Sequence, residues 1–77
     1  MLLEIIEARI QFATYKLNRQ LTSEEAKIFL YDNIFMLSRS ISEDRQSLVN
    51  CPNLFQDEPI LARCWLDGQV SWTNSQY

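Results

Sequence analysis

Three pairs of adjacent acidic residues are the first candidates for chemistry in this chain of 77 residues. They are Glu24-Glu25, Glu43-Asp44 and Asp57-Glu58. Acid–base catalysis by two carboxylates requires a cleft in which the two groups have different environments. Glu24-Glu25 is explained by a helix start, where acidic side chains complement the helix dipole, and the other two pairs are typical of solvated loops. We therefore expect no catalytic residues among these pairs.

The chain contains no histidine, and this absence narrows the possible chemistry. Histidine is the usual proton-transfer group near neutral pH and the commonest metal ligand. A serine nucleophile would need a lysine base instead, and both lysines, Lys16 and Lys27, fall on ordinary helix faces. The single glycine leaves no phosphate-binding loop. The sequence predicts that the protein is not an enzyme and binds no cofactor.

Two cysteines, Cys51 and Cys64, are 13 positions apart. No second cysteine pair and no histidine is present to complete a four-ligand zinc site, so no metal site is expected. A cytosolic chain keeps its thiols reduced. The sequence favours two partly buried free thiols, and a disulfide is the alternative.

The charge balance and the hydropathy pattern exclude two classes of partner. Ten acidic and seven basic residues give a net charge of −3, which offers no electrostatic footprint for nucleic acid. The longest apolar runs, such as Ile34-Phe35-Met36-Leu37, are far shorter than the roughly 20 residues needed to span a bilayer. Glu4 stands where a secretory signal would carry a basic residue. We expect a cytoplasmic protein that binds neither nucleic acid nor a membrane.

The chain is expected to form one small domain, residues 1–77, whose first part is a helical hairpin, residues 1–41. A folded chain of this size buries only about 60–65% of its unfolded surface, so its own core is marginal. Two neighbouring apolar stripes give the expected first helix a wide apolar surface. One stripe has the 3-4 spacing of a coiled coil and consists of Leu3, Ile6, Ile10, Ala13 and Leu17; the other consists of Leu2, Ile5, Phe12 and Tyr15.

A second helix is expected to start at Thr22-Ser23-Glu24-Glu25, which has the form of a capping box. A short link over residues 18–22 predicts that the two helices run antiparallel. Apolar residues surround nearly the whole second helix, so one hairpin cannot bury all of this surface. Either two chains pair as a homodimeric four-helix bundle, or the C-terminal region folds back over the hairpin.

The second half of the chain is expected to be a loop with a short helical turn, residues 42–59, then a β-hairpin, residues 60–73, and a flexible tail, residues 74–77. Asp67-Gly68 between two β-favouring runs predicts a type I′ turn. The predicted fold is therefore mainly α, or α+β if the β-hairpin packs on the helices.

In the expected β-hairpin, aromatic and basic side chains share one face. Tryptophan and arginine on one face are typical of binding hot spots, although two tryptophans are equally typical of a core. The candidate partner-binding residues are Arg63, Trp65, Val70 and Trp72 of this face, with Tyr31 and Phe35 of the second helix. Most of the basic residues are interpreted as ordinary surface charge, and a docking patch for an anionic partner is the alternative. These residues are Arg9, Lys16, Arg19, Lys27 and Arg39.

The segment Leu21-Thr22-Ser23-Glu24-x-Ala26-x-x-Phe29-Leu30 resembles the start of the second helix in the cyanobacterial phycobilisome degradation protein family, NblA. The family pattern there is Met-Ser-x-Glu-Gln-Ala-Gln-x-Phe-Leu, and Arg9 and Phe12 are similar to its Arg-x-Phe-containing first helix. The resemblance covers residues 5–40. It implies a dimeric four-helix bundle and an adaptor that presents a pigment protein for proteolysis. The predicted β-hairpin has no counterpart in that family.

Together these features predict a small non-enzymatic regulatory protein that binds a larger protein as an adaptor or an inhibitor. The phycobilisome-degradation role is one form of this hypothesis. The alternatives are a permanent structural subunit of a larger protein assembly and a small inhibitor of a metabolic enzyme.

Overall fold

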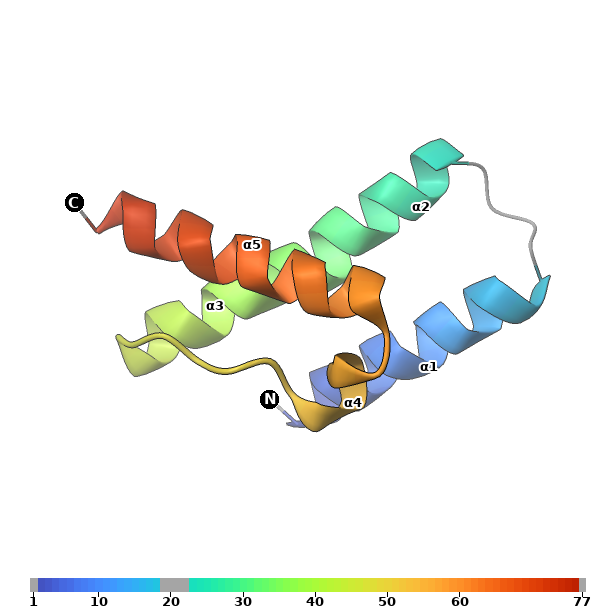
Figure 1. Ribbon diagram of the computed structural model, residues 1–77, viewed down its shortest axis with the longest axis horizontal. Coiled ribbons are helices and arrows are strands. Elements are labelled where there is room, and N and C mark those ends of the chain that lie inside the picture. Colours follow the sequence, from blue (N-terminus) through green and yellow to red (C-terminus); the bar gives the residue numbers. More distant parts are fainter. Residues whose placement is uncertain (1, 19–22, 77) are drawn as a thin grey trace.

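The computed structural model describes residues 2–18 and 23–76, which are helical over most of their length and contain no strand (Figure 1). The mainly helical class predicted from the sequence is confirmed. The link over residues 19–22, including the capping residue Thr22, lies outside the described residues. The elements are α1 (Leu2–Asn18), α2 (Ser23–Leu30), the π-helical η1 (Tyr31–Phe35), α3 (Met36–Arg45), α4 (Asn53–Gln56) and α5 (Pro59–Ser75).

Three of these elements, α2, η1 and α3, follow one another without a break and form one long helix. The five-residue π segment widens this helix at its middle, where the Met36 N–H donates to the Tyr31 carbonyl. The long helix ends at Gln46, whose φ of 54° and ψ of 38° lie in the left-handed region that commonly terminates helices. Residues 42–45, expected at the start of a loop, therefore belong to α3.

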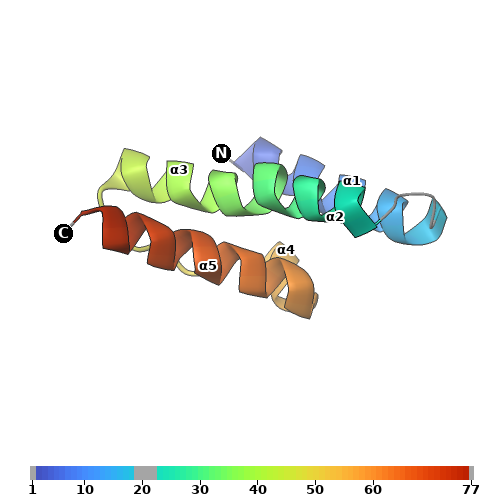
Figure 2. The same ribbon diagram turned by 90° about the horizontal axis from the view of Figure 1, so that it is seen from above.

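The long helix lies between α1 and α5 (Figure 2). The helix α1 runs antiparallel to it, as the hairpin hypothesis expects, whereas α5 runs parallel to it (Figures 1 and 2). The segment 46–58, which includes α4, carries the chain back along α5 (Figure 1). The C-terminal region thus covers one side of the long helix. This arrangement corresponds to the second possibility given above, in which the C-terminal region folds back over the helical hairpin.

The core lies where η1, α4 and α5 meet. Its largest fully buried apolar side chains are Trp65, Phe55, Ile34 and Leu61. The rings of Phe55 and Trp65 are tilted by 58° with centroids 5.9 Å apart, a favourable aromatic geometry. From α1, Ala8 and Phe12 extend this core.

Gly68 lets α5 approach the long helix closely. A Cβ built on Gly68 would lie 2.6 Å from the Phe35 carbonyl oxygen and 2.7 Å from Ser38 Cβ. Both distances are shorter than any tolerable contact, and the first is to backbone. Glycine is therefore required here for packing, and its φ is not positive.

The buried side chain of Gln69 joins three segments by hydrogen bonds. Its Oε1 accepts from Ser42 Oγ at 2.7 Å and from the Val49 N–H at 2.6 Å, and its Nε2 donates to the Ser38 carbonyl at 3.0 Å and to Ser38 Oγ at 2.8 Å. Trp65 Nε1 donates to the Val49 carbonyl at 3.0 Å. These bonds fix residue 49 against α5 and satisfy the polar groups that the packing buries.

The β-hairpin predicted for residues 60–73 is wrong, because these residues lie within α5, which continues to Ser75. Pro59 occupies the first turn of α5, where its missing N–H costs nothing. A type I′ turn needs a positive φ at Gly68, and the φ of Gly68 is not positive. The buried positions of α5 follow the helical period: Leu61, Trp65, Gly68, Gln69 and Trp72. Burying both tryptophans on one helix face outweighs the local preference of Asp-Gly for a turn.

Candidate functional site

Among the paired acidic residues, Glu43, Asp57 and Glu58 have structural partners. Glu43 Oε2 accepts from Trp72 Nε1 at 2.8 Å. Asp57 and Glu58 face α1 and form ion pairs there. Within residues 2–18 and 23–76, no group of three histidine, cysteine or acidic side chains is arranged to hold a metal ion.

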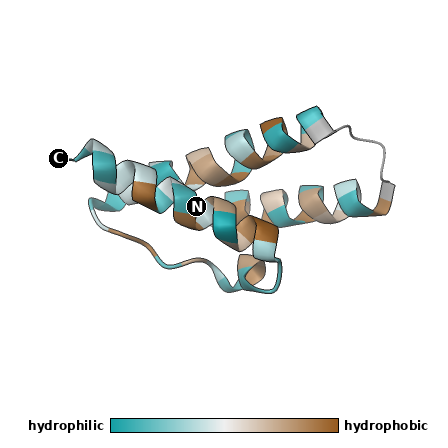
Figure 3. Cartoon of the chain, turned by 45° about the horizontal axis from the view of Figure 1, so that its top comes forward, coloured by the Kyte–Doolittle hydropathy of each residue, from teal (hydrophilic) through white to brown (hydrophobic). Residues whose placement is uncertain are grey.

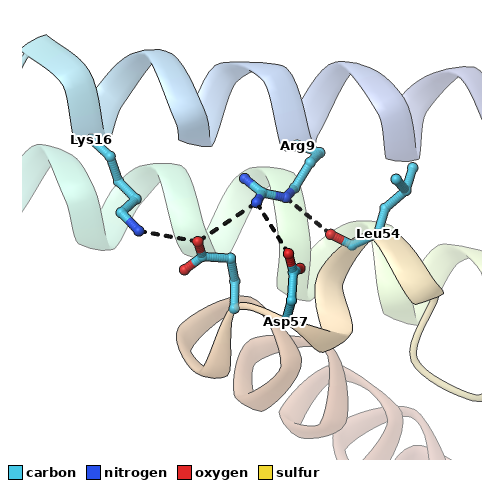
Figure 4. Close-up of polar contacts among 5 residues, drawn as sticks. Arg9, Lys16, Leu54 and Asp57 are labelled. Atoms are coloured by element: carbon cyan, nitrogen blue, oxygen red, sulfur yellow. Dashed lines mark hydrogen bonds and ion pairs between the residues drawn. The ribbon is translucent and has the colours of Figure 1, made fainter.

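Arg9 and Lys16 of α1 make a polar joint with the segment between α4 and α5 (Figure 4). Arg9 Nε donates to the Leu54 carbonyl at 3.0 Å, and the Arg9 guanidinium lies 3.7 Å from Asp57 and 3.6 Å from Glu58. Lys16 Nζ lies 3.0 Å from the same Glu58 oxygen. Arg9 and Lys16 therefore form ion pairs within the chain. This argues against their forming a basic docking patch for an anionic partner.

The six residues expected to bind a partner do not form one surface. Trp65 and Trp72 are only 1% and 7% exposed, so within this chain they are part of the packed interior. Arg63 lies on the opposite face of α5, exposed, with its Nε 3.4 Å from Asp67 Oδ1. Val70 is half exposed.

The remaining two candidates lie on η1. Tyr31 is exposed and its ring stacks on Phe35, with centroids 5.0 Å apart and an interplanar angle of 15°. The backbone of Phe35 faces Gly68. In a helix, residues seven apart share a face, so Arg63 goes with Val70 and Trp65 with Trp72. The β-hairpin hypothesis had placed all four together.

A groove of about 420 Å³ lies between α5 and the connecting segment that follows α3. Its rim carries Leu48, Leu66 and Val70, each at least half exposed. Trp65 and Gln69, both buried, form its floor. None of the described residues that line it is charged, although 22% of the chain is. The lining consists of Leu48, Val49, Asn50, Cys51, Trp65, Leu66, Gln69, Val70, Thr73 and Asn74.

Hydrogen bonds join the two walls of this groove. Gln46 turns the chain out of α3, and the bonds from the Val49 N–H to Gln69 and from Trp65 Nε1 to the Val49 carbonyl set the distance between the two walls. The groove is therefore preformed. Of the residues that line the groove, the sequence predicted Trp65 and Val70 as partner-binding residues, but not Leu48, Val49 or Leu66. The adjacent apolar pair Leu48-Val49, between polar neighbours, was the available signal.

The two cysteines are free, and their thiols are partly buried. Burial raises the pKa of the Cys51 thiol, which lines the groove. Burial, and to a lesser extent the charge of Asp67, raises the pKa of Cys64. Both sulfurs are therefore protonated at neutral pH, and a thiol is a weaker nucleophile and metal ligand than a thiolate. The groove therefore presents apolar side chains and uncharged polar side chains.

Comparison of the chain with models of protein families, with curated proteins and with solved structures gives no match. In the described part of the chain, no helix combines the length and the apolar character that crossing a membrane requires.

Proposed function

We propose that this chain is a small non-enzymatic regulatory protein that binds a larger protein, as an adaptor or an inhibitor, and that the groove beside α5 receives an apolar segment of that partner. The observation that carries the proposal is the uncharged lining of the groove together with its exposed aliphatic rim. Interface cores are depleted of charged side chains, whereas ordinary surface is not.

The shape and chemistry of the groove suit one amphipathic helix of a partner. Such a helix lays apolar side chains at i, i+3 or i+4 and i+7 into a groove. Leu66 and Val70 stand one turn apart on α5 and Leu48 faces them from the other wall. Asn50, Thr73 and Asn74 supply neutral hydrogen-bonding groups at the edge. Because the walls are already fixed by Gln69, little ordering is needed on binding.

The resemblance to the phycobilisome degradation proteins, over residues 5–40, would make a phycobiliprotein the partner. The groove lies outside that stretch, since its lining begins at Leu48. A phycobiliprotein therefore enters the test as a specific probe and is not assumed by the proposal.

The test compares wild type with Val70→Asp in affinity purification from source lysate, followed by mass spectrometry. Val70 is half exposed, so the chain should still fold with aspartate at this position. Partner binding would bury the charge of that aspartate, and this should abolish capture. Ile28→Asp, at a similarly exposed position on α2, is the matched control and should retain the partner.

The captured protein, and separately a purified phycobiliprotein, is then titrated against each variant, and its binding is followed by isothermal titration calorimetry. A partner held in stoichiometric amount by wild type and Ile28→Asp but lost by Val70→Asp supports the proposal. Equal retention by Val70→Asp, or no stoichiometric partner at all, contradicts it. Aggregation of the purified chain that only co-expression relieves would favour a permanent subunit instead.

A further inference from the structure

A small cavity lies where α1, α2 and the first turn of α5 meet, and we call it the aromatic pocket. Its volume is about 190 Å³, less than half that of the groove beside α5. Hydrophobic residues recur along α1 and α2 (Figure 3). The described lining of the pocket shares no residue with the groove. Most of this lining is apolar or aromatic and consists of Phe12, Tyr15, Ala26, Phe29, Leu30 and Ile60.

Aromatic rings form much of the wall of this pocket. Phe12 is 3% exposed and belongs to the packed interior. Its ring centroid lies 6.2 Å from that of Tyr15 and 6.4 Å from that of Phe29 on α2. Rings at such separations attract one another beyond the effect of area burial, because the face and the edge of a ring carry opposite partial charges. Three rings around one cavity therefore favour an aromatic ring as its occupant over a saturated group.

The charged groups of the pocket form an ion pair and fix the polarity of the occupant. Lys16 Nζ lies 3.0 Å from Glu58 Oε1 and 5.7 Å from the centroid of the Phe12 ring. The Arg9 guanidinium lies 3.6 Å from the same oxygen. In the described part of the chain both of these contacts use Oε1, so Oε2 is the acceptor that a bound molecule can use.

This ion pair disfavours a charged occupant of either sign. A ligand carboxylate would be repelled by Glu58, and a ligand ammonium would be repelled by Lys16. A neutral hydroxyl or N–H group meets neither penalty and can donate to Glu58 Oε2. The pocket therefore selects an uncharged hydrogen-bond donor attached to the ring.

The volume limits the occupant to a single ring. An engineered apolar cavity of about 150 Å³ accommodates benzene, so about 190 Å³ accommodates one ring with a small substituent. We propose that the aromatic pocket binds a small neutral aromatic molecule with one hydrogen-bond donor, of the phenol class, whose ring packs against Phe12 and Phe29 and whose donor bonds Glu58. Because the pocket joins α1 to α2 and α5, the bound molecule stabilises the position of α1.

The test is a titration of the ¹⁵N-labelled full chain with phenol, followed by amide chemical shifts. Phenol should shift the amides around Phe12 and Phe29 in a saturable manner, with a Kd on the order of 1 mM for so small a ligand. Toluene lacks the hydroxyl group, and cyclohexanol lacks the aromatic ring. Both have as many non-hydrogen atoms as phenol and should bind at least about five times more weakly.

A space-filling substitution locates the binding site. Ala26→Leu fills the pocket from its α2 wall and should weaken phenol binding at least about tenfold. Ala13→Leu is the matched control, because it makes the same change at a partly exposed position of α1 that lines a different cleft. It should bind phenol like wild type. Helical circular dichroism shows whether each variant is folded, and Ala26→Met replaces Ala26→Leu if the latter loses its helical signal.

Saturable shifts at the pocket that Ala26→Leu removes and Ala13→Leu retains support the proposal. It is overturned by wild type that shows no saturable shift at about ten times the expected Kd, and by a folded Ala26→Leu chain that binds phenol undiminished. Equal binding of phenol, toluene and cyclohexanol overturns the assigned class of ligand. The proposal is independent of the proposed function, since loss of partner binding by Val70→Asp should leave phenol binding unchanged.

Discussion

Gly68 is the residue at which the packing of the fold is least tolerant. On an exposed helix face, replacing glycine by alanine stabilises by up to about 1 kcal/mol. At position 68 the added methyl group would meet the Phe35 carbonyl oxygen at 2.6 Å, and a backbone atom within a helix cannot move aside cheaply. Replacing Gly68 by alanine is therefore expected to destabilise the chain.

We expect Gly68→Ala to lower the free energy of unfolding by about 1–3 kcal/mol, the usual cost of overpacking. Urea denaturation followed by circular dichroism measures the change. Leu66→Ala, two residues away on the exposed face, is the control and should change stability by less than about 0.5 kcal/mol beyond its small propensity effect. A more stable Gly68→Ala protein would contradict the close contact between α5 and the long helix.

At the scale of elements, α1 is joined to the rest of the chain by the ion pairs of Glu58. The carboxylate of Glu58 is 18% exposed and meets both Arg9 and Lys16, whereas a comparable pair, Arg63 with Asp67, is largely exposed. Shared, partly buried ion pairs contribute more than isolated surface pairs. The ion pairs of Glu58 are therefore expected to stabilise the fold more than the pair of Arg63 and Asp67 does.

Glu58→Gln should lower the free energy of unfolding by about 1 kcal/mol at low ionic strength, and by less in high salt, because it removes the charge that both cations share. Thermal unfolding at two salt concentrations provides the measurement. Asp67→Asn serves as the control and should be nearly neutral. Equal effects of the two substitutions would show that the joint does not stabilise the position of α1.

The β-hairpin error also belongs to the scale of elements. Asp67-Gly68 is a strong local signal for a turn, and the alternative signals were Pro59 at a helix start and the separation of seven residues between Trp65 and Trp72. Local preferences of this kind are worth about 1 kcal/mol, whereas burying one large side chain contributes about 1.5–3 kcal/mol. The helix buries both tryptophans at once, and this packing decides the conformation.

For the molecule as a whole, stability should be distributed unevenly. The core lies where η1, α4 and α5 meet and holds Trp65 and Leu61, and the Gln69 hydrogen bonds are buried between α5 and α3, while α1 contributes few fully buried side chains. Elements with few buried contacts open at lower free energy. We expect α1 to be the least protected of the long helical elements.

Hydrogen exchange followed by mass spectrometry tests this expectation at low protein concentration. Amides of α1 should exchange at least about ten times faster than those of α3 and α5. Equal protection of α1 and α5 in the monomer would contradict the uneven distribution.

The candidate site was foreseen only in part. Val70 was selected from the sequence and lies on the rim of the groove, but it was chosen for a β-strand face that does not exist. Leu48 and Leu66 were missed, because a groove between a helix and a returning segment joins residues far apart in the chain, and neither wall shows it alone. The sequence left Trp65 and Trp72 open between a core and an interface, and within this chain both are buried.

The sequence by itself predicted two helices within residues 1–41 and an excess of apolar surface beyond one helical hairpin, since these follow from periodicity and composition along a continuous segment. Only the tertiary structure decided that residues 42–45 and 59–75 are helical, that α5 covers one side of the long helix, and that Leu3, Ile10 and Leu17 of α1 are left exposed. Each of these depends on which faces meet in space. Gly68 shows why: the same residue is read locally as a turn, and in the folded chain it is the point where two helices touch.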